Sequence, residues 1–327
     1  MKFKFASVLL LALCGALWLS ACKPNSSGDR TGVQVKDASG QLVTVSDSSR
    51  IVSIGTALTE TVYALGAGSR LVGVDNSSGE YLPQAASLPK VGPRTALNAE
   101  GILSLKPTLI LLTTDAAPPQ VIEQLKASGV TTLMLNANYT AEAVREKVVT
   151  ISHALGLDAK GEELSNAIDR DMREVKSLKD RALTTPKVLF VGRGPNMPNA
   201  TMSGRKTTID EMIRAAGGSN PMSSFDGFKE MTDEAVVNAA PDIILMTEKS
   251  FERSGGVDGV LKFPGVALTP AGRNRRIVAV SDMYFQGFGP GVGRAIYDLT
   301  LKLHPDLGAD GKGAETTTAP GAGVDKK

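Results

Sequence analysis

A repeated pattern constrains the fold of this 327-residue chain more than any other feature, because residues 97–112 are echoed by residues 231–246. Each copy has apolar residues at helical spacing, a glutamate in the expected first turn (Glu100, Glu234), and a proline seven residues after that glutamate. Proline cannot continue a helix, because it lacks the N–H and its ring clashes with the preceding turn. The apolar run that follows suits a parallel strand covered on both faces. The pattern therefore predicts two similar lobes, each with a short helix that leads into a buried strand.

Short apolar strands supply the rest of each predicted lobe. Residues 50–55 and 187–192 match one another, and both runs end at a glycine. In the first lobe, further strands are predicted at residues 71–74, 108–112 and 131–135, with helices at residues 58–65 and 119–128. Alternation of strands and helices gives a parallel sheet with right-handed crossovers. We therefore expect an α/β fold of two similar lobes with mainly parallel sheets, at residues 50–156 and 185–305.

Two segments outside this repeat bear on how the lobes work. Residues 157–184 carry apolar residues at steps of three and four, which predicts one long helix joining the lobes. Such a helix makes a rigid hinge, so the lobes should close on a ligand by small movements. Residues 193–206 follow the first strand of the second lobe and are rich in Gly, Pro, Asn and Met. Ligands bind beyond the carboxyl ends of strands in open α/β sheets, so this loop is a candidate cleft element.

The amino terminus has the features of a lipoprotein signal. Two lysines precede an apolar run that is short for a membrane-spanning helix of about 20 residues and that fits a signal peptide. Leu-Ser-Ala-Cys at residues 19–22 resembles the lipobox of bacterial lipoproteins, which implies cleavage before Cys22 and lipidation of its thiol. The alternative is an ordinary signal peptide with an incidental cysteine. We expect a signal peptide at residues 1–21, a lipid-anchored tether and lead-in at residues 22–49, and a disordered tail at residues 306–327.

Composition excludes several classes of function. Without the two leader lysines, the 36 Lys and Arg fall to 34 and balance the 34 Asp and Glu, so charge gives no case for nucleic-acid binding. Cys14 leaves with the leader and Cys22 carries the lipid, which excludes a disulfide, a thiolate metal site and an iron–sulfur cluster in the lobes. The sequence has no nucleophile elbow and no phosphate-binding loop, and His153 and His304 are interpreted as solvated helix residues. These features predict a binding protein rather than an enzyme.

One tyrosine has the setting of a ligand-binding residue. Tyr81 lies in residues 75–83, whose Asn, Ser and Gly content predicts a loop at the carboxyl edge of the first sheet. Tyr63 and Tyr297 occur among apolar residues at helical spacing and are expected in the core or on a helix surface. A loop phenolate can ligate a hard cation such as Fe(III), helped by a nearby arginine. The alternative is a surface tyrosine that packs on Pro83.

Several runs resemble bacterial periplasmic haem-binding proteins of ABC haem importers, which are related to vitamin B12 and siderophore binders. They are Leu-Pro-Lys-Val-Gly at 88–92, Ala-Glu-Gly-Ile-Leu-Ser-Leu-Lys-Pro at 99–107, Met-Ser-Gly-Arg-Lys-Thr at 202–207, the Gly-Gly-Val-Asp-Gly-Val-Leu run at 255–261, the Phe-Pro-Gly run at 263–273 and Gly-Phe-Gly-Pro at 287–290. The resemblance implies a class III periplasmic binding protein with a helical backbone and a shallow cleft. It also implies haem as the transported ligand, a membrane permease with its ATPase as partner, and a location on the periplasmic side of the cell envelope.

The resemblance further implies roles for individual residues. It places the haem-ligating tyrosine in the segment that contains Tyr81. Arg94, Arg205 and Arg253 become candidates for pairing with the haem propionates, because a guanidinium binds a carboxylate through two hydrogen bonds. In the resembled family, one glutamate per lobe pairs with arginines of the permease, a role that falls to Glu100 and Glu234. Their alternative role is to stabilise a helix N-terminus by about 0.3–1 kcal/mol.

The chain departs from the family pattern at two arginines. The family often has Val-Gly-Tyr-x-Arg where this chain has Val-Gly-Pro-Arg-Thr, so Arg94 stands one place early. It commonly has Gly-Pro-Arg where this chain has Gly289-Pro290-Gly291, with the next arginine at Arg294. Both departures bear on which arginines could contact the propionates. Three alternatives to a haem carrier also stay open: a ferric siderophore or corrinoid carrier, an envelope haem-processing enzyme, and a non-transport adhesin.

Overall fold

The computed structural model describes residues 32–192, 199–286 and 288–308, which belong to one compact unit. The predicted signal peptide, Cys22 and residues 309–327 lie outside the described residues. The predicted tail begins in a described 3-10 turn, η4 (Pro305–Gly308). Among the helices of the described part, none is both long and apolar enough to cross a membrane.

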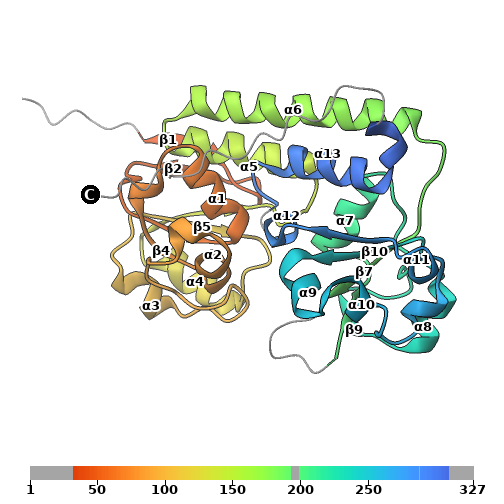
Figure 1. Ribbon diagram of the computed structural model, residues 1–327. Coiled ribbons are helices and arrows are strands. Elements are labelled where there is room, and N and C mark those ends of the chain that lie inside the picture. The colour runs from red at the N-terminus through yellow and green to blue at the C-terminus, as the bar shows by residue number, and fades with distance from the viewer. Residues whose placement is uncertain (1–31, 193–198, 287, 309–327) are drawn as a thin grey trace, which may run out of the picture. The chain divides into compact units, whose positions relative to one another are not determined.

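The first lobe is built on a four-stranded parallel sheet in the order β4-β3-β5-β6 (Figure 1). Its strands are β3 (Ile51–Ile54), β4 (Leu71–Val74), β5 (Leu109–Thr113) and β6 (Thr131–Leu135). Its helices are α1 (Thr56–Ala64), α2 (Asn76–Tyr81), α3 (Ala99–Ser104), α4 (Pro119–Ala127) and α5 (Ala141–Ala154), with 3-10 turns η1 (Gly68–Arg70) and η2 (Pro83–Ala85). Every residue of β3 and β5 is buried, as expected for central strands covered on both faces. The four strands predicted from the apolar runs are confirmed.

A short hairpin precedes this sheet and was not predicted. Strand β1 (Val33–Lys36) pairs antiparallel with β2 (Leu42–Val45), within the segment expected to be a lead-in. The Asp37 carboxylate accepts hydrogen bonds from the amides of Ser39 and Gln41, and Gly40 takes a positive φ of 84°, which closes the turn. Val35 and Val45 add to the core of the first lobe, against which β1 packs through α5.

The second lobe has a five-stranded mixed sheet in the order β11-β10-β7-β8-β9. Strands β7 (Val188–Gly192), β10 (Ile243–Thr247) and β11 (Ile277–Val280) are parallel, whereas β8 (Thr201–Ser203) pairs antiparallel with both β7 and β9 (Phe228–Glu230). Its helices are α7 (Thr208–Ala215), α8 (Asp233–Ala239), α9 (Glu248–Arg253), α10 (Gly256–Val260), α11 (Pro270–Arg273), α12 (Asp282–Gln286) and α13 (Val292–Leu303), with the 3-10 turn η3 (Val266–Leu268). The segment predicted as an inserted loop thus contains β8, so the loop prediction is wrong at residues 201–203.

The repeated pattern forms the same structure in both lobes. Helices α3 and α8 are each capped by a side chain that accepts an amide hydrogen bond, Asn98 from Gly101 at 2.8 Å and Thr232 from Ala235 at 3.3 Å. Each helix ends before the proline, at a residue with a left-handed backbone: Lys106 has φ 49° and Ala240 has φ 44°. The proline therefore fixes the exit toward the strand, and the left-handed residue before it stops the helix.

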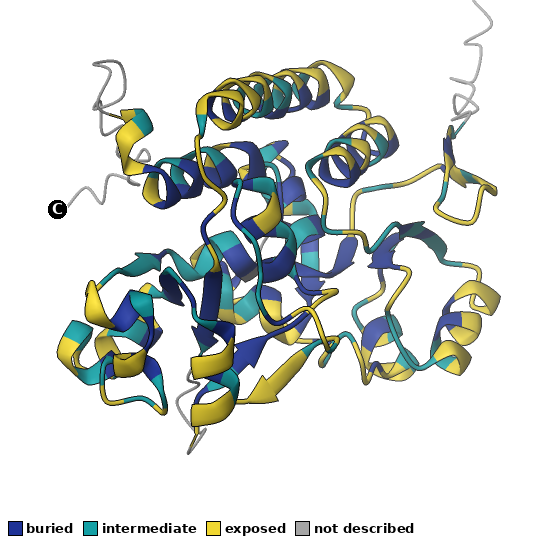
Figure 2. Cartoon of the chain, turned by 90° about the vertical axis from the view of Figure 1, so that its right-hand side faces the viewer, coloured by how far each residue is buried: buried dark blue, intermediate teal, exposed yellow. Residues whose placement is uncertain are grey.

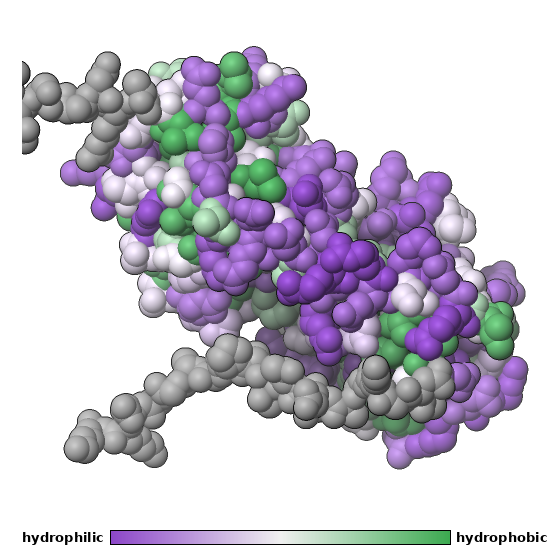
Figure 3. All heavy atoms as spheres, turned by 90° about the horizontal axis from the view of Figure 1, so that it is seen from above, coloured by the Kyte–Doolittle hydropathy of each residue, from purple (hydrophilic) through white to green (hydrophobic). Residues whose placement is uncertain are grey.

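The long helix α6 (Asp158–Arg181) packs along α5 of the first lobe and α13 of the second (Figure 1). Ile168, Val175 and Leu178 are buried on one face, while the opposite face is polar. Figure 3, which looks onto this side of the molecule, shows mostly hydrophilic residues. The single joining helix is therefore confirmed.

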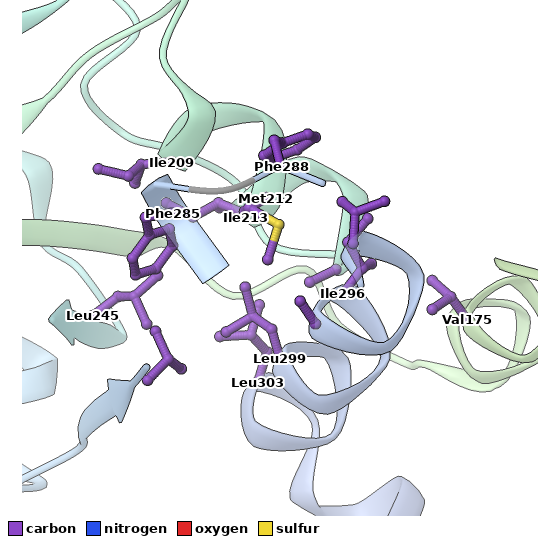
Figure 4. Close-up of a cluster of buried hydrophobic side chains, with 14 of the residues drawn as sticks. Val175, Ile209, Met212, Ile213, Leu245, Phe285, Phe288, Ile296, Leu299 and Leu303 are labelled. Carbon is purple, nitrogen blue, oxygen red and sulfur yellow. The ribbon is translucent and has the colours of Figure 1, made fainter. Parts of the chain in front are cut away.

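The apolar cores lie on both faces of the two sheets, beneath helices whose outer faces are exposed (Figure 2). The largest cluster belongs to the second lobe and joins α6, α7, α12 and α13. Figure 4 shows Phe285 and Phe288 meeting Ile209, Met212 and Ile213 within this cluster. Both phenylalanines also line a pocket between the lobes, so the core extends directly into the ligand-facing surface.

Candidate binding site between the lobes

A pocket of about 410 Å³ lies between the two lobes. Gly55, Asp75, Thr113 and Tyr139 line it from the first lobe, each at or just beyond the carboxyl end of a strand of the parallel sheet. Open α/β sheets bind ligands at this edge, and small-molecule sites have volumes of about 300–1,000 Å³. Position and size both fit a small-molecule site.

The second lobe gives the pocket an apolar wall. Phe285 and Phe288 are almost fully buried and line the pocket with Ile209 and Phe228. The Phe285 ring meets Phe190 edge-on at 5.3 Å, which connects the wall to the sheet behind it. Phe288 meets Tyr139 of the first lobe edge-on at 5.9 Å. This aromatic contact joins the two lobes across the pocket.

The first lobe gives the pocket a charged floor. The Arg94 guanidinium forms an ion pair with Asp115, and the Thr113 hydroxyl donates to the same carboxylate at 2.7 Å. Burial raises the pKa of Tyr139, and Asp115 raises it further, whereas a hydrogen bond from Arg94 opposes the shift. Of the three arginines predicted from the resemblance, Arg94 is the one that lines the pocket.

A buried polar network fixes the start of α2 at the pocket edge. Asp75 is 1% exposed, and its carboxylate accepts hydrogen bonds from the Gly55 amide at 3.0 Å and from the Ser78 hydroxyl. Ser78 is 3.0 Å from the Thr59 hydroxyl, which donates to Ser53. A satisfied network of this kind rigidifies its surroundings. It ties α2 to α1 and to the end of β3.

Tyr81 is the last residue of α2, so the prediction of a loop at this residue is wrong. Its helix places it one turn beyond Ser77, which lines the pocket, although Tyr81 itself does not. The ring lies 6.0 Å from Lys249 Nζ of the second lobe. Burial raises the pKa of Tyr81, as do Glu80 and Asp282, whereas Arg253 lowers it. The structure therefore brings Tyr81 and Arg253 close to each other, although neither residue lines the pocket.

The remaining predicted residues lie on exposed surfaces. Arg205 forms an ion pair with Asp226 at 3.0 Å, beside Lys206, which pairs with the same carboxylate at 2.7 Å. Lys206 lines the pocket and has a positive φ of 58°. Glu100 and Glu234 are exposed in the first turns of α3 and α8. Of the three predicted arginines, Arg205 and Arg253 thus do not line the pocket.

The departure from the family pattern at residues 289–291 has a structural outcome. Gly291 stands where the resembled family has arginine, and its backbone N–H donates to Glu60 of the first lobe. Arg294 pairs with Asp298 at 3.0 Å and stacks on Tyr297 at 4.7 Å, away from the residues that line the pocket. Arg294 therefore does not replace the family arginine at this pocket.

One of the two histidines differs from its prediction. His153 is exposed and contacts Asp158 at 2.8 Å, as expected of a solvated helix residue. His304 follows α13 and is 6% exposed, so its assignment to a solvated position is wrong. Burial lowers the pKa of His304. Within the part of the chain that the structure describes, no group of three or more His, Cys, Asp and Glu residues could hold a metal ion.

Tyr139 and Lys147 are among the pocket residues that sequence reasoning missed. Tyr139 follows β6 in the polar run Asn-Ala-Asn-Tyr, so the rule that selected Tyr81 could have found it. Lys147 lies on α5 among charged residues, where the sequence favours a solvated position; the fold buries it. The signal that could have found it is helical spacing from Val144 and Ile151, which puts Lys147 on the apolar face of α5.

Known proteins are similar to this chain along most of its length. The family model for periplasmic binding proteins matches residues 51–283. The ABC transporter substrate-binding lipoprotein YvrC of Bacillus subtilis strain 168 is 28% identical over 316 residues, which cover 93% of this chain and 98% of that protein. The vitamin B12-binding protein of Vibrio parahaemolyticus is 26% identical over 208 residues, covering 63% of this chain and 73% of that protein.

Solved structures of haem-binding proteins are similar in both sequence and fold. The periplasmic haem-binding protein RhuT from Roseiflexus sp. RS-1, in its apo form, is 39% identical with a TM-score of 0.70, covering 80% of this chain and all of that one. The periplasmic haem-binding protein BhuT, in complex with two haems, is 38% identical with a TM-score of 0.71 and the same coverage. With its two lobes, its long joining helix and its interlobe pocket, the chain belongs to the periplasmic binding protein family, as a substrate-binding protein of an ABC transporter.

Proposed function

We propose that the protein captures Fe(III) haem in the pocket between the lobes and delivers it to the membrane permease. The observation that carries the proposal is the pairing of an aromatic wall, Phe285 and Phe288, with a cationic floor that includes Arg94. A flat apolar macrocycle with acidic side chains suits such a pair of surfaces. The similarity to RhuT and BhuT, both named as haem-binding proteins, supports the same ligand.

Tyr81 is the proposed axial ligand of the haem iron. It stands one helical turn beyond Ser77, which lines the pocket, and this spacing supports the assignment. The pKa of the free phenol is raised above its ordinary value, so the charge of Fe(III) must displace the proton. Arg253 favours the phenolate and so assists ligation. Arg253, Arg94 and Arg205 are proposed to meet the propionates.

Titration of the apo-protein with hemin tests this assignment. We expect a ferric tyrosinate absorption spectrum that is lost in Tyr81→Phe, which keeps the ring and removes the ligating oxygen. Tyr139→Phe is the matched control, because Tyr139 also lies near the pocket but is not the proposed ligand. Loss of the tyrosinate bands in Tyr139→Phe alone would assign the iron to Tyr139. Failure of the wild-type protein to bind hemin would overturn the proposed function.

Two contacts outside the pocket complete the proposal. Glu100 and Glu234 are exposed at equivalent positions of the two lobes and are proposed to pair with arginines of the permease.

Cys22 is proposed to carry the lipid that anchors the protein on the periplasmic side of the membrane; the relative YvrC is named as a lipoprotein. Cys22→Ala expressed in cells should move the protein from the membrane fraction to the soluble fraction. Retention in the membrane would contradict the anchor.

A corrinoid is the second candidate ligand, because several relatives are named vitamin B12-binding proteins. Competition separates the two candidates. Cyanocobalamin should fail to displace hemin if haem is the ligand. Tight binding of cyanocobalamin by a protein that takes up no hemin would favour the corrinoid, and the same experiment with a ferric siderophore tests the third member of this ligand class.

A further inference from the structure

Lys147 is a buried cation at the pocket to which the proposed function assigns no role. It lies on α5, is 4% exposed, and lines the interlobe pocket. Its ammonium donates to the Asn138 carbonyl at 3.2 Å, between Ala137 and Tyr139, which line the same pocket. Lys147 also borders a separate hollow of about 300 Å³ together with Lys36, Asp37 and Ala38. The hydrogen bond to Asn138 holds the ammonium beside two residues that line the interlobe pocket.

The buried ammonium has few protein partners. It carries three N–H donors, and the bond to Asn138 uses one of them. Among the described residues, no carboxylate lies within ion-pair distance of Lys147, and Asp115, which attracts it, is already paired with Arg94. Burial lowers the pKa of Lys147 to about 8, so the side chain is still mostly charged at neutral pH. A buried charge without a close counter-ion destabilises the empty protein, and an anion in the pocket would relieve this cost.

The charged groups leave the pocket lining as a whole with a positive charge. Arg94, Lys147 and Lys206 contribute three cations, and Asp75 and Asp115 contribute two anions. Tyr139 adds a hydroxyl, which is a donor while its raised pKa keeps it neutral. A carboxylate of the ligand could thus accept hydrogen bonds from two or more donors on this floor.

We propose that Lys147, with Arg94, recognises an acidic group of the ligand at the floor of the pocket. The inference rests on the proposed function and refines it: for haem the acidic group is a propionate. It also provides selectivity, because the peripheral side chains of a corrinoid such as cyanocobalamin are amides and offer no carboxylate to this cation. Lys147 is thus a specificity-determining residue, distinct from the residue that ligates the iron.

Hemin binding by Lys147→Met tests the proposal, because methionine keeps an apolar stem and removes the charge. We expect the dissociation constant for hemin to rise about tenfold or more, equivalent to loss of one charge-assisted hydrogen bond, while the tyrosinate absorption bands stay unchanged. Hemin dimethyl ester, in which both propionates are esterified, should bind wild type and variant equally. Lys160→Met is the matched control, since Lys160 is an exposed lysine paired with Glu163 on α6, and it should bind hemin as wild type does.

The outcomes separate this inference from the proposed function. Hemin binding by Lys147→Met within twofold of wild type overturns the role of Lys147 and leaves haem as the ligand. An equal loss of hemin and of its dimethyl ester shows a structural effect and overturns it as well. Failure of wild type to bind hemin overturns both proposals. Thermal unfolding of the apo-variant checks the fold, and we expect it to be at least as stable as wild type, because it lacks the buried charge.

Discussion

The two lobes are alike in scaffold and unlike at the pocket. In each lobe a capped helix, a left-handed residue and a proline lead into a buried strand, and an exposed glutamate stands in the first helical turn. The pocket faces differ: the first lobe presents a charged floor and the second mainly an apolar wall. The repeat therefore specifies the sheets and their outer edge, whereas the pocket is lined mainly by unrepeated residues that follow the strands.

The largest expected effect comes from breaking the apolar wall. Phe288→Ala should lower the free energy of unfolding by about 3–4 kcal/mol, because a buried aromatic ring is removed and leaves a cavity. Urea unfolding measures the change. Phe228→Ala is the control, since Phe228 lines the same pocket but is 55% exposed. This change should lower the free energy of unfolding by less than about 0.5 kcal/mol. Equal costs for the two variants would show that the wall is not part of the core.

Substitution of the two exposed glutamates tests whether both lobes contact the permease through equivalent residues. Glu100→Arg with Glu234→Arg should reduce haem uptake by cells about tenfold or more, because each change places like charges against the proposed permease arginines. Hemin binding by the purified variant should stay at the wild-type value. Glu123→Arg, at another exposed glutamate of the first lobe, is the control for added positive charge. Loss of hemin binding in the double variant would contradict the docking role and would indicate that both residues support the fold.

Glu60 links the lobes and makes stability depend on pH. It lies on α1 of the first lobe, accepts the Gly291 amide of the second, and has a pKa raised by burial to about 7. A Cβ on Gly289 would lie 2.3 Å from the Glu60 carboxylate, so the backbone approaches closely. Because the folded pKa exceeds the unfolded value of 4.5, Glu60 stabilises the fold at low pH, and this contribution is lost as pH rises through about 7.

Glu60→Gln removes this titration. We expect the variant and wild type to be equally stable near pH 4, and the variant to be more stable by about 1–2 kcal/mol at pH 8, a value reduced for the water that still reaches the partly exposed carboxylate. Urea unfolding at both pH values gives the comparison. A difference between the proteins that does not change with pH would rule out the raised pKa.

The smallest effect concerns the helix caps. Asn98→Ala and Thr232→Ala should each lower the free energy of unfolding by about 0.5–1 kcal/mol, because each removes the acceptor of one amide hydrogen bond. Urea unfolding of the two variants side by side measures whether the lobes depend equally on the repeat. If only one variant lowers the free energy of unfolding, the two matching caps do not contribute equally to stability.

The elements that could be predicted from the sequence are those with a clear local pattern of apolar residues. Central strands such as β3 and β5 are continuous apolar runs, and α6 has a sustained helical period, so their residues alone identify them. Strands β1, β2, β8 and β9 have three or four residues each, too few to show a period. Tyr139 fits the same rule that selected Tyr81. Lys147 lies at helical spacing from Val144 and Ile151 on the buried face of α5, so the period indicates its burial although its charge favours solvent. His304 is buried beside Gly217, which is distant in the sequence, so no local pattern reveals its position.

The helix α6, which packs along α5 of the first lobe and α13 of the second, also governs how the protein melts. Unfolding of either lobe would expose apolar residues of α6, such as Ile168 and Val175, to water. The two sheets therefore share one unit of cooperativity. We expect a single calorimetric transition whose measured enthalpy equals its van't Hoff enthalpy, although a chain with two separate sheets could melt in two steps.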